Sequence, residues 1–208
     1  MAIFGGMQMN NMENWNIKGH EVEFIGDTHT YLVDGLIVPS ITQILKFKFN
    51  KKYDGIPKGT LQRAAELGTQ MHEVIQNYEE QGTESEIKEL RNYKFLKKQY
   101  KWECLANEVP VILWHDDEIV GAGRLDMVME LDGQKGLADL KRTSTLDKEY
   151  LGYQLNLYRL AYQQSYGEEI EFLRGIHLRE DVRKFVKIPI NEELTIKLLE
   201  EWKEKEDE

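Results

Sequence analysis

An Asp-Gly turn between two alternating apolar runs is the feature that most constrains the fold of this chain. The stretch GRLDMVMELDGQKGLADLKRT spans residues 123–143 and turns at Asp132 and Gly133. Two-residue hairpins of this kind need positive φ at both central residues, which Asp-Gly adopts readily. With these two residues in the turn, Asp126 lies opposite Asp139 on the neighbouring strand. The sequence therefore predicts a β-hairpin that carries two opposed carboxylates.

These carboxylates share their face with the ammonium group of Lys141, two residues further along the second strand. Like charges at opposed positions destabilise a sheet, so a cation is expected to bridge Asp126 and Asp139. A divalent metal with oxygen ligands fits this position. The alternative is an amphipathic hairpin whose charged face is solvated, and a register shift of one residue would separate the two acids. The hairpin alone leaves both interpretations open.

Composition bounds the class of protein. The chain has 208 residues, of which 41% are hydrophobic, and this suits one domain with a sizeable core. No apolar run reaches about 18 residues, so no transmembrane helix is expected. The N-terminus lacks the basic start and apolar stretch of a signal peptide, and Cys104 is the single cysteine. We therefore expect a cytoplasmic protein without a disulfide or a cysteine-ligated metal.

Charge is unevenly distributed along the chain. The formal net charge of −10 argues against a nucleic-acid binder. Residues 46–63 and 88–101 are nevertheless locally basic, whereas residues 191–208 are acidic. The two basic segments are candidates for contact with phosphates, and the alternative is that they are ordinary solvated surfaces.

The pattern of the chain predicts a mixed α/β core. Residues 1–19 are expected to form a flexible arm, and residues 20–208 a single domain. A β meander over 22–38 leads into a short helix over 41–47, capped by Ser40. The later elements are expected in the order helix, helix, three strands, helix, two strands and helix. The helices are expected over 61–80 behind a Thr60 cap, from a Thr83–Glu86 capping box to 101, over 147–165 and over 192–205. The strands are expected over 105–114, 119–131, 136–142, 170–178 and 182–188.

Several other polar residues lie where they would join the hairpin. Glu108 lies in the strand before it, and His72 lies at the edge of an apolar helical stripe. Gln154 and Tyr158 are one helical turn apart, so they face the same locality. Taken singly, each has a plain structural explanation: an edge glutamate, a satisfied core histidine, and a helix pair packed on a strand. The stripe beside His72 consists of Leu61, Ala64, Ala65, Gly68, Met71, Ile75 and Tyr78.

Taken together, these features resemble the PD-(D/E)XK nuclease superfamily, of RecB or phage-exonuclease type. The stretches GAGRLDMVME, GLADLKRT and YQLNLYRLAY resemble its G-x-x-D strand, D/E-x-K strand and Q-x3-Y helix. RAAELGTQMHEVI resembles the G-x-x-x-H helix of the same group, and YLVDGLIVPSITQIL resembles the N-terminal segment of phage-encoded members. The resemblance spans roughly residues 30–165. The D/E position holds Asp139, and the iron–sulfur cysteines of some relatives are absent.

The resemblance implies a restriction-endonuclease-like α/β fold, of mixed α+β type, whose central mixed sheet is flanked by helices. It also implies a deoxyribonuclease that depends on Mg²⁺ or Mn²⁺. The implied metal ligands are Asp126, Asp139, His72 and the backbone carbonyl of Leu140. Lys141 would orient the attacking water and stabilise the charge that develops on the phosphate. The other implied catalytic residues are Gln154 and Tyr158, which would position these groups, and Glu108, which would support a second metal or the water network.

The expected substrate is DNA, as linear ends or a single strand. The residues expected to contact it are Lys51, Lys52, Lys58, Arg63 and Arg142. An exonuclease of phage recombination or end processing would work in a bacterial host, with a single-strand annealing or recombination protein or a second copy of the chain as candidate partners. The alternatives are an inactive nucleic-acid-binding or assembly module on the same fold, or a nuclease that needs a partner protein.

Overall fold

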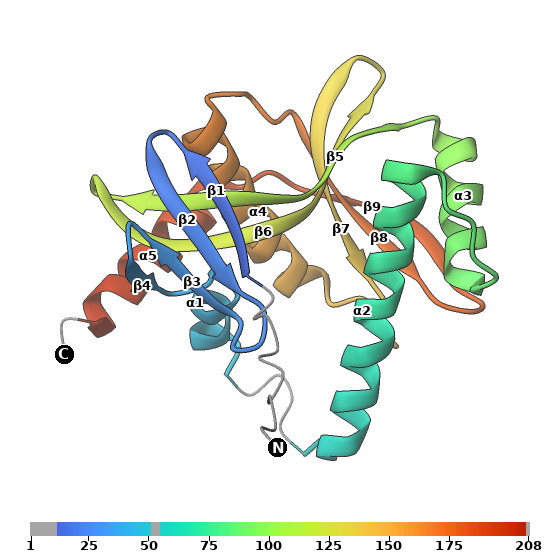
Figure 1. Cartoon of the computed structure of the whole chain (residues 1–208), viewed down its shortest axis with the longest axis horizontal. Helices are drawn as coiled ribbons and strands as arrows, with labels where there is room; N and C mark the ends of the chain where they lie inside the picture. The colour runs from blue at the N-terminus through green and yellow to red at the C-terminus, as the bar shows by residue number, and fades with distance from the viewer. Residues whose placement is uncertain (1–11, 51–54, 207–208) are drawn as a thin grey trace, which may run out of the picture.

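The structure is a computed structural model that describes residues 12–50 and 55–206, and within these ranges it contains two sheets and five helices (Figure 1). The strands are β1 (Met12–Ile17), β2 (His20–Ile25), β3 (Thr30–Val33), β4 (Leu36–Val38), β5 (Glu103–His115), β6 (Glu118–Leu131), β7 (Gln134–Lys141), β8 (Phe172–Leu178) and β9 (Arg183–Ile188). The helices are α1 (Ile41–Lys48), α2 (Lys58–Gln81), α3 (Lys88–Tyr100), α4 (Lys148–Tyr166) and α5 (Glu192–Glu206). None of these helices has the length and apolarity needed to cross a membrane.

The larger sheet has five strands in the order β5-β6-β7-β8-β9. Strands β5, β6 and β7 form an antiparallel meander, and β8 and β9 are also antiparallel. Between them β7 and β8 run parallel, and α4 makes the long crossover that a parallel pair requires. The predicted order of elements from α1 onward and the mixed sheet flanked by helices are therefore confirmed.

The central hairpin has the register that the Asp-Gly turn predicts. Asp132 and Gly133 have φ values of 54° and 77°, as such a turn requires. Met127 pairs with Ala138. Continuing this register by one residue places Asp126 opposite Asp139. The two acids are thus on adjacent strands at the same level of the sheet.

This hairpin is buried on both of its faces. Met127 and Ala138 are buried on one face, and Val128 and Leu137 are buried on the other. The interpretation as an amphipathic hairpin with a solvated charged face is therefore wrong. Helices cover both sides of the sheet, so Asp139 is buried and Asp126 and Lys141 are partly buried.

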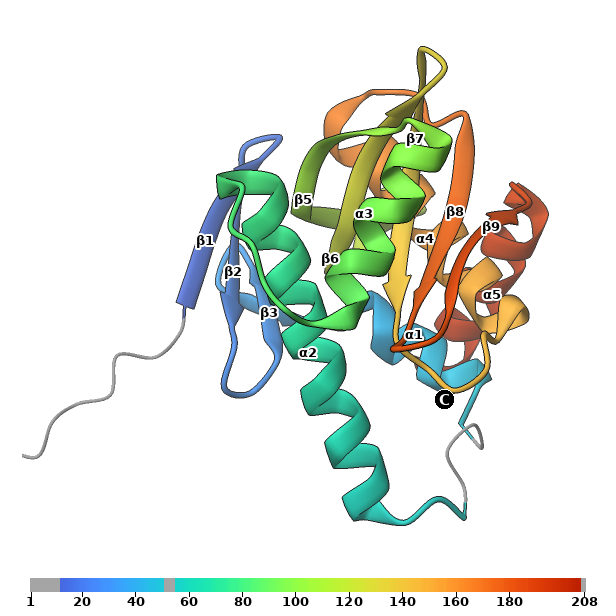
Figure 2. The ribbon, with the colours of Figure 1, turned by 90° about the vertical axis from the view of Figure 1, so that its right-hand side faces the viewer.

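Two groups of helices form the two covering layers (Figure 2). Helices α1, α4 and α5 pack on one face through a core that includes Ile44, Leu155, Leu198 and the sheet residue Leu137. Helices α2 and α3 pack on the other face. The core there contains Met71, Ile75, Leu90, Tyr93, Leu96, Met127, Met129, Ala138, Leu140 and Ile176.

The smaller sheet has the order β1-β2-β3-β4 and lies against the β5–β6 hairpin (Figure 1). Val22, Phe24 and Tyr31 share a core with Ile112 and Ala122 of the larger sheet. The junction is held by a hydrogen bond of 3.0 Å from the Ala122 amide to the Pro39 carbonyl. Gly121 allows this close approach, because a Cβ on it would lie 3.0 Å from that carbonyl oxygen.

The predicted flexible arm extends too far along the chain. Residues 1–11 lie outside the described residues, but β1 occupies Met12–Ile17 and pairs with β2. Lys18 and Gly19 both have positive φ and form the turn between these strands. The sequence of β1 gave no apolar signal from which to predict a strand, because Ile17 is its one buried residue. The domain boundary expected at residue 20 therefore leaves out β1, which belongs to the smaller sheet.

Two helix starts differ from the prediction, whereas the Ser40 capping box of α1 and the Asp147 cap of α4 are confirmed. Helix α2 begins at Lys58 behind Pro57, so Thr60 lies inside the helix. Helix α3 begins at Lys88 and not behind the Thr83–Glu86 pattern. Packing against the sheet sets the start of α3, since Glu89, Leu90 and Tyr93 are buried from its first turn onward.

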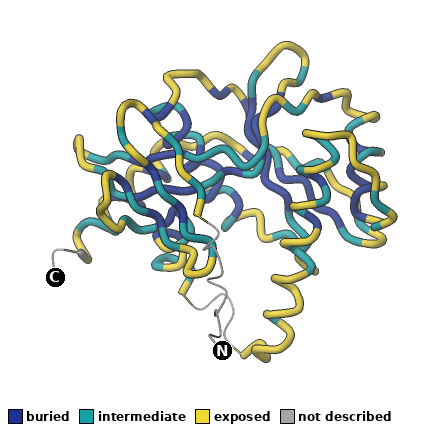
Figure 3. Tube along the Cα trace, in the orientation of Figure 1, coloured by how far each residue is buried: buried dark blue, intermediate teal, exposed yellow. Residues whose placement is uncertain are grey.

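The apolar stripe of α2 is buried over half of its length. Met71 and Ile75 are fully buried, whereas Ala64 and Ala65 are exposed. Figure 3 shows that the N-terminal turns of α2 are exposed where the helix projects from the body. His72 lies close to the point where α2 meets the sheet.

Candidate metal centre

Three side chains from three elements meet beside the central hairpin. His72 comes from α2, Glu108 from β5 and Asp126 from β6, and one ligand atom of each lies within 4.8 Å of the others. The Nδ1 atom of His72 is 3.7 Å from both Glu108 Oε1 and Asp126 Oδ1. All three residues are partly buried. Two carboxylates and an imidazole at this spacing form a candidate site for a divalent cation.

The ring of His72 is fixed on its other side by the backbone of β7. Its Nε2 donates a hydrogen bond of 3.0 Å to the carbonyl oxygen of Leu140. Burial alone would lower the pKa of His72, but the carboxylates of Asp126, Glu108 and Asp139 raise it to about 9. The imidazolium therefore supplies the positive charge that the acids need in this arrangement.

Asp126 is oriented by the strand opposite it. Its Oδ2 accepts a hydrogen bond of 2.7 Å from the Leu140 amide, and its Oδ1 faces His72. This cross-strand bond depends directly on the hairpin register. Leu140 therefore bonds to the site through both its amide and its carbonyl, and both of these are backbone groups.

Asp139 and Lys141 form a buried ion pair next to these three residues. Lys141 Nζ lies 2.6 Å from Asp139 Oδ2, and the side chain of Asp139 is only 3% exposed. Burial raises the pKa of Asp139 to about 6, although Lys141 opposes this rise. Burial would lower the pKa of Lys141, but Asp139 and Asp126 raise it above its usual value, so the ammonium stays charged. Ligation by Asp139 stays a prediction, because the grouped ligand atoms come from His72, Glu108 and Asp126.

Glu108 has an unusual backbone conformation for its place in the sheet. Its φ is 48°, and the other described non-glycine residues with positive φ lie in turns or at a helix end. Such a conformation costs on the order of 1–3 kcal/mol and persists where the surroundings enforce it. The pairing register continues across this position, since Asn107 pairs with Met127 and Val109 with Leu125, and the Glu108 carboxylate lies near His72. The sequence alone left the direction of the Glu108 side chain open.

Arg124 holds Glu108 in place, a contact that the sequence did not predict. Its Nε lies 2.7 Å from Glu108 Oε2, and its Nη1 lies 2.6 Å from Glu13 Oε1. Arg124 lies two residues before Asp126 on the same strand, so strand alternation predicts that both side chains point to the same face of the sheet. Glu13 had no such signal, because it lies 111 residues away in the segment expected to be a flexible arm.

Gln154 and Tyr158 are both buried on the face of α4 that meets the sheet. Gln154 Oε1 accepts no hydrogen bond from any described residue. Tyr158 packs against Gly123, where an added Cβ would lie 3.0 Å from its ring. Burial raises the pKa of Tyr158 well above its usual value, and Asp126 and Asp139 add to the rise, so the phenol stays protonated. Their predicted contact with Lys141 stays a prediction.

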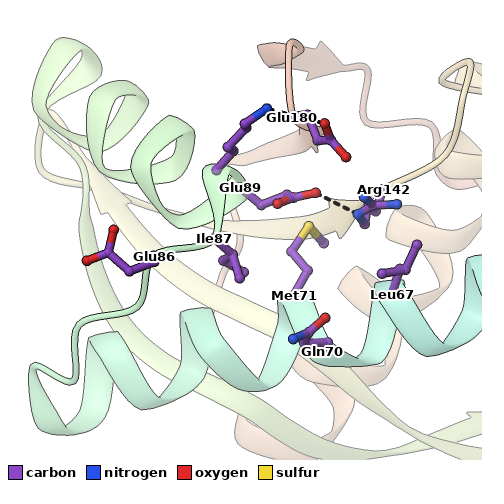
Figure 4. A pocket seen from close by; sticks show the side chains of 9 residues that line it. Leu67, Gln70, Met71, Glu86, Ile87, Glu89, Arg142 and Glu180 are labelled. Carbon is purple, nitrogen blue, oxygen red and sulfur yellow. Dashed lines mark hydrogen bonds and ion pairs between the residues drawn. The ribbon is translucent and has the colours of Figure 1, made fainter.

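The basic residues expected to contact DNA differ in their surroundings. Lys58 and Arg63 are exposed on the projecting half of α2, while Lys51 and Lys52 lie outside the described residues. Arg142 Nε lies 2.7 Å from Glu89 Oε1 in a pocket of about 310 Å³ between α2 and α3 (Figure 4). Both side chains of this pair are largely buried. Contact of Arg142 with DNA stays a prediction, and its guanidinium has a buried carboxylate partner in this structure.

Comparison with known proteins finds similarity among solved structures. Neither a protein-family model nor a curated protein sequence matches this chain. A solved structure titled "Crystal structure of SSO0001" matches with a TM-score of 0.44 and 15% sequence identity, covering 79% of this chain and 74% of that chain. A match at this level defines neither a fold family nor a function.

Proposed function

We propose that this chain is a metal-dependent nuclease that hydrolyses phosphodiester bonds of DNA. The observation that carries the proposal is the convergence of His72, Glu108 and Asp126 beside the buried pair of Asp139 and Lys141. These five residues come from α2, β5, β6 and β7, so tertiary structure brings them together. On this proposal the mixed sheet and its helices are a restriction-endonuclease-like core.

The donor set fits Mg²⁺ or Mn²⁺. Carboxylate oxygens and a nearby backbone carbonyl are ligands that Mg²⁺ accepts, and it retains waters besides. One imidazole nitrogen makes Mn²⁺ equally suitable. When bound there, the ion supplies Lewis-acid chemistry, which polarises a phosphate and lowers the pKa of a water molecule. The charged form of His72 would have to lose its proton before Nδ1 could ligate.

The surrounding residues have roles that agree with this chemistry. The Lys141 ammonium lies inside the protein, where its charge would stabilise a phosphate more strongly than it would in water. Asp139 fixes the position of that ammonium. The free Oε1 of buried Gln154 is available to accept a hydrogen bond from a water or from Lys141. Arg124 positions Glu108 through its Oε2 atom, whereas the atom of Glu108 that faces His72 is Oε1.

The substrate that this proposal favours is a DNA end or a single strand, as in phage recombination or end processing. The test is release of nucleotides from end-labelled linear DNA, with closed circular DNA beside it, in Mg²⁺, Mn²⁺ or chelator. We expect metal-dependent degradation of the linear DNA. Degradation of the closed circle at the same rate would replace the exonuclease proposal by an endonuclease.

A matched pair of variants ties any cleavage to this site. Asp126→Asn removes a charge from the ligand group, whereas Asp132→Asn makes the same change in the turn of the same hairpin, where Asn adopts positive φ well. We expect the first variant to lose cleavage by a factor of about 100 or more and the second to retain it. Chelator-insensitive DNA binding without cleavage of any substrate by the wild type would favour an inactive binding module.

A further inference from the structure

The outer face of α3 carries a basic surface with aromatic rings that the metal centre does not use. A pocket of about 440 Å³ between α2 and α3 is lined by Tyr78, Arg91, Lys94, Phe95, Lys97 and Lys98. Four of these six residues are cations, two are aromatic, and none is acidic. We define this set of residues as the α3 surface.

Helical spacing explains why these side chains gather. Arg91, Phe95 and Lys98 recur at intervals of four and three residues, so they share one face of α3. The opposite face carries the fully buried Leu90 and Tyr93, which pack toward the sheet. The exposed face is therefore fixed in direction by the core beneath it.

Charge on this surface is only partly neutralised. Lys94 pairs with Glu84, and Lys97 pairs with Glu79. Arg91 and Lys98 are exposed and form no ion pair with any described residue. These two free cations are available to phosphates.

An aromatic ring lies exposed among these cations. Phe95 is 45% exposed and lies among the cations of this pocket. The guanidinium of Arg183, on β9, lies 3.7 Å from the centre of its ring. Lys94 Nζ lies similarly over the ring of Tyr78, at 5.1 Å. Flat guanidinium and aromatic surfaces beside free cations are what successive unstacked bases and their phosphates require.

We propose that the α3 surface binds single-stranded DNA. A duplex presents phosphates but covers its base faces, so it would leave Phe95 without a role. A protein partner is disfavoured, since interface cores are depleted in lysine. Tyr78 and His72 lie six residues apart on α2, which is about 9 Å along the helix axis. The surface and the metal centre therefore share a helix, but binding at the surface does not depend on the metal centre.

The test measures binding in chelator, so that cleavage cannot occur. Fluorescence anisotropy with labelled oligothymidylate, and with a labelled duplex as comparison, gives the affinity and its salt dependence. We expect Phe95→Ala to weaken single-strand binding about tenfold and duplex binding much less. The double change of Arg91→Gln with Lys98→Gln should lower the slope of log affinity against log salt by about 1.4.

Matched controls lie on α5, which packs on the other face of the sheet. Ile196→Ala removes an exposed apolar side chain, and Lys197→Gln removes an exposed charge. Both controls should bind oligothymidylate like the wild type, and circular dichroism checks that every variant is folded. Undiminished binding by Phe95→Ala, or no single-strand binding by the wild type, overturns the proposal. Binding is measured in chelator and cleavage in Mn²⁺, so a failure of the nuclease proposal and a failure of this one are distinguishable.

Discussion

Lys141 Nζ lies 2.6 Å from Asp139 Oδ2, and the two residues point from the same face of β7 into the protein. The pair lies in the middle of a five-stranded sheet and not at a solvated edge. A buried ion pair is weak evidence for stability, because desolvation offsets much of its Coulombic gain. A functional role is the better explanation for keeping a lysine at this position.

Removal of this ammonium should abolish cleavage. We expect Lys141→Ala to lower the rate of DNA hydrolysis by a factor of about 100 or more, as loss of a transition-state donor does. Lys135→Ala is the matched control, because Lys135 lies on the same strand but pairs with the half-exposed Glu168. Rates of nucleotide release under saturating Mn²⁺ measure both. Equal rates in the two variants would remove Lys141 from the site.

Removal of the Arg124 guanidinium should weaken metal binding. Arg124→Gln deprives Glu108 of its partner, and loss of such a supporting group typically costs about tenfold in metal affinity. Glu13→Gln is the control, since Glu13 is 41% exposed, and such surface pairs contribute about 0–1 kcal/mol. Calorimetric titration with Mn²⁺ measures both affinities. A similar loss in both variants would show that the whole ion-pair chain, and not Glu108 alone, sets the affinity.

Metal affinity should rise with pH because a proton must leave His72. The acids raise the pKa of His72 from 6.5 to about 9, so the ring is charged at neutral pH and opposes a cation. In the metal-free protein, the stabilisation from the charged ring is complete below pH 6.5 and is lost as the pH rises through about 9. Over this window Mn²⁺ affinity should rise, by at most about tenfold per pH unit.

His72→Gln is the variant that checks this assignment. Asp139 titrates near pH 6, below most of the window, so the removal of His72 should flatten the pH dependence. Calorimetric titrations at several pH values give the two profiles. An unchanged profile in the variant would assign the titration to another group.

Substitution of Gly123 should destabilise the packing of α4 on the sheet. In Gly123→Ala the new methyl group would lie 3.0 Å from the Tyr158 ring and 3.2 Å from Ile41 Cδ1. Such overpacking costs about 1–3 kcal/mol of unfolding free energy. Gly152→Ala, inside α4, meets nothing within 4 Å and should instead stabilise by up to about 1 kcal/mol. Urea unfolding followed by circular dichroism measures the two opposite shifts.

Local patterns predicted most of the elements because each depends on neighbouring residues. The Asp-Gly turn set the register of β6 and β7, and Ser40 and Asp147 marked true helix starts. The starts of α2 and α3 were mispredicted, since neither helix has a capping side chain. Packing on the sheet sets the start of α3, whereas α2 begins behind Pro57 in a part of the helix that is exposed.

The sequence by itself determined which side chains the hairpin carries, because side-chain alternation and the turn fix Asp126, Asp139 and Lys141 in one locality. Tertiary structure decided what surrounds them. It brought in His72 from α2 and Glu108 from β5, where Glu108 has a positive φ of 48°. It also placed Glu13 beside Arg124 across 111 residues. These contacts join separate elements, and their energies depend on burial and long-range packing, which no local pattern of residues encodes.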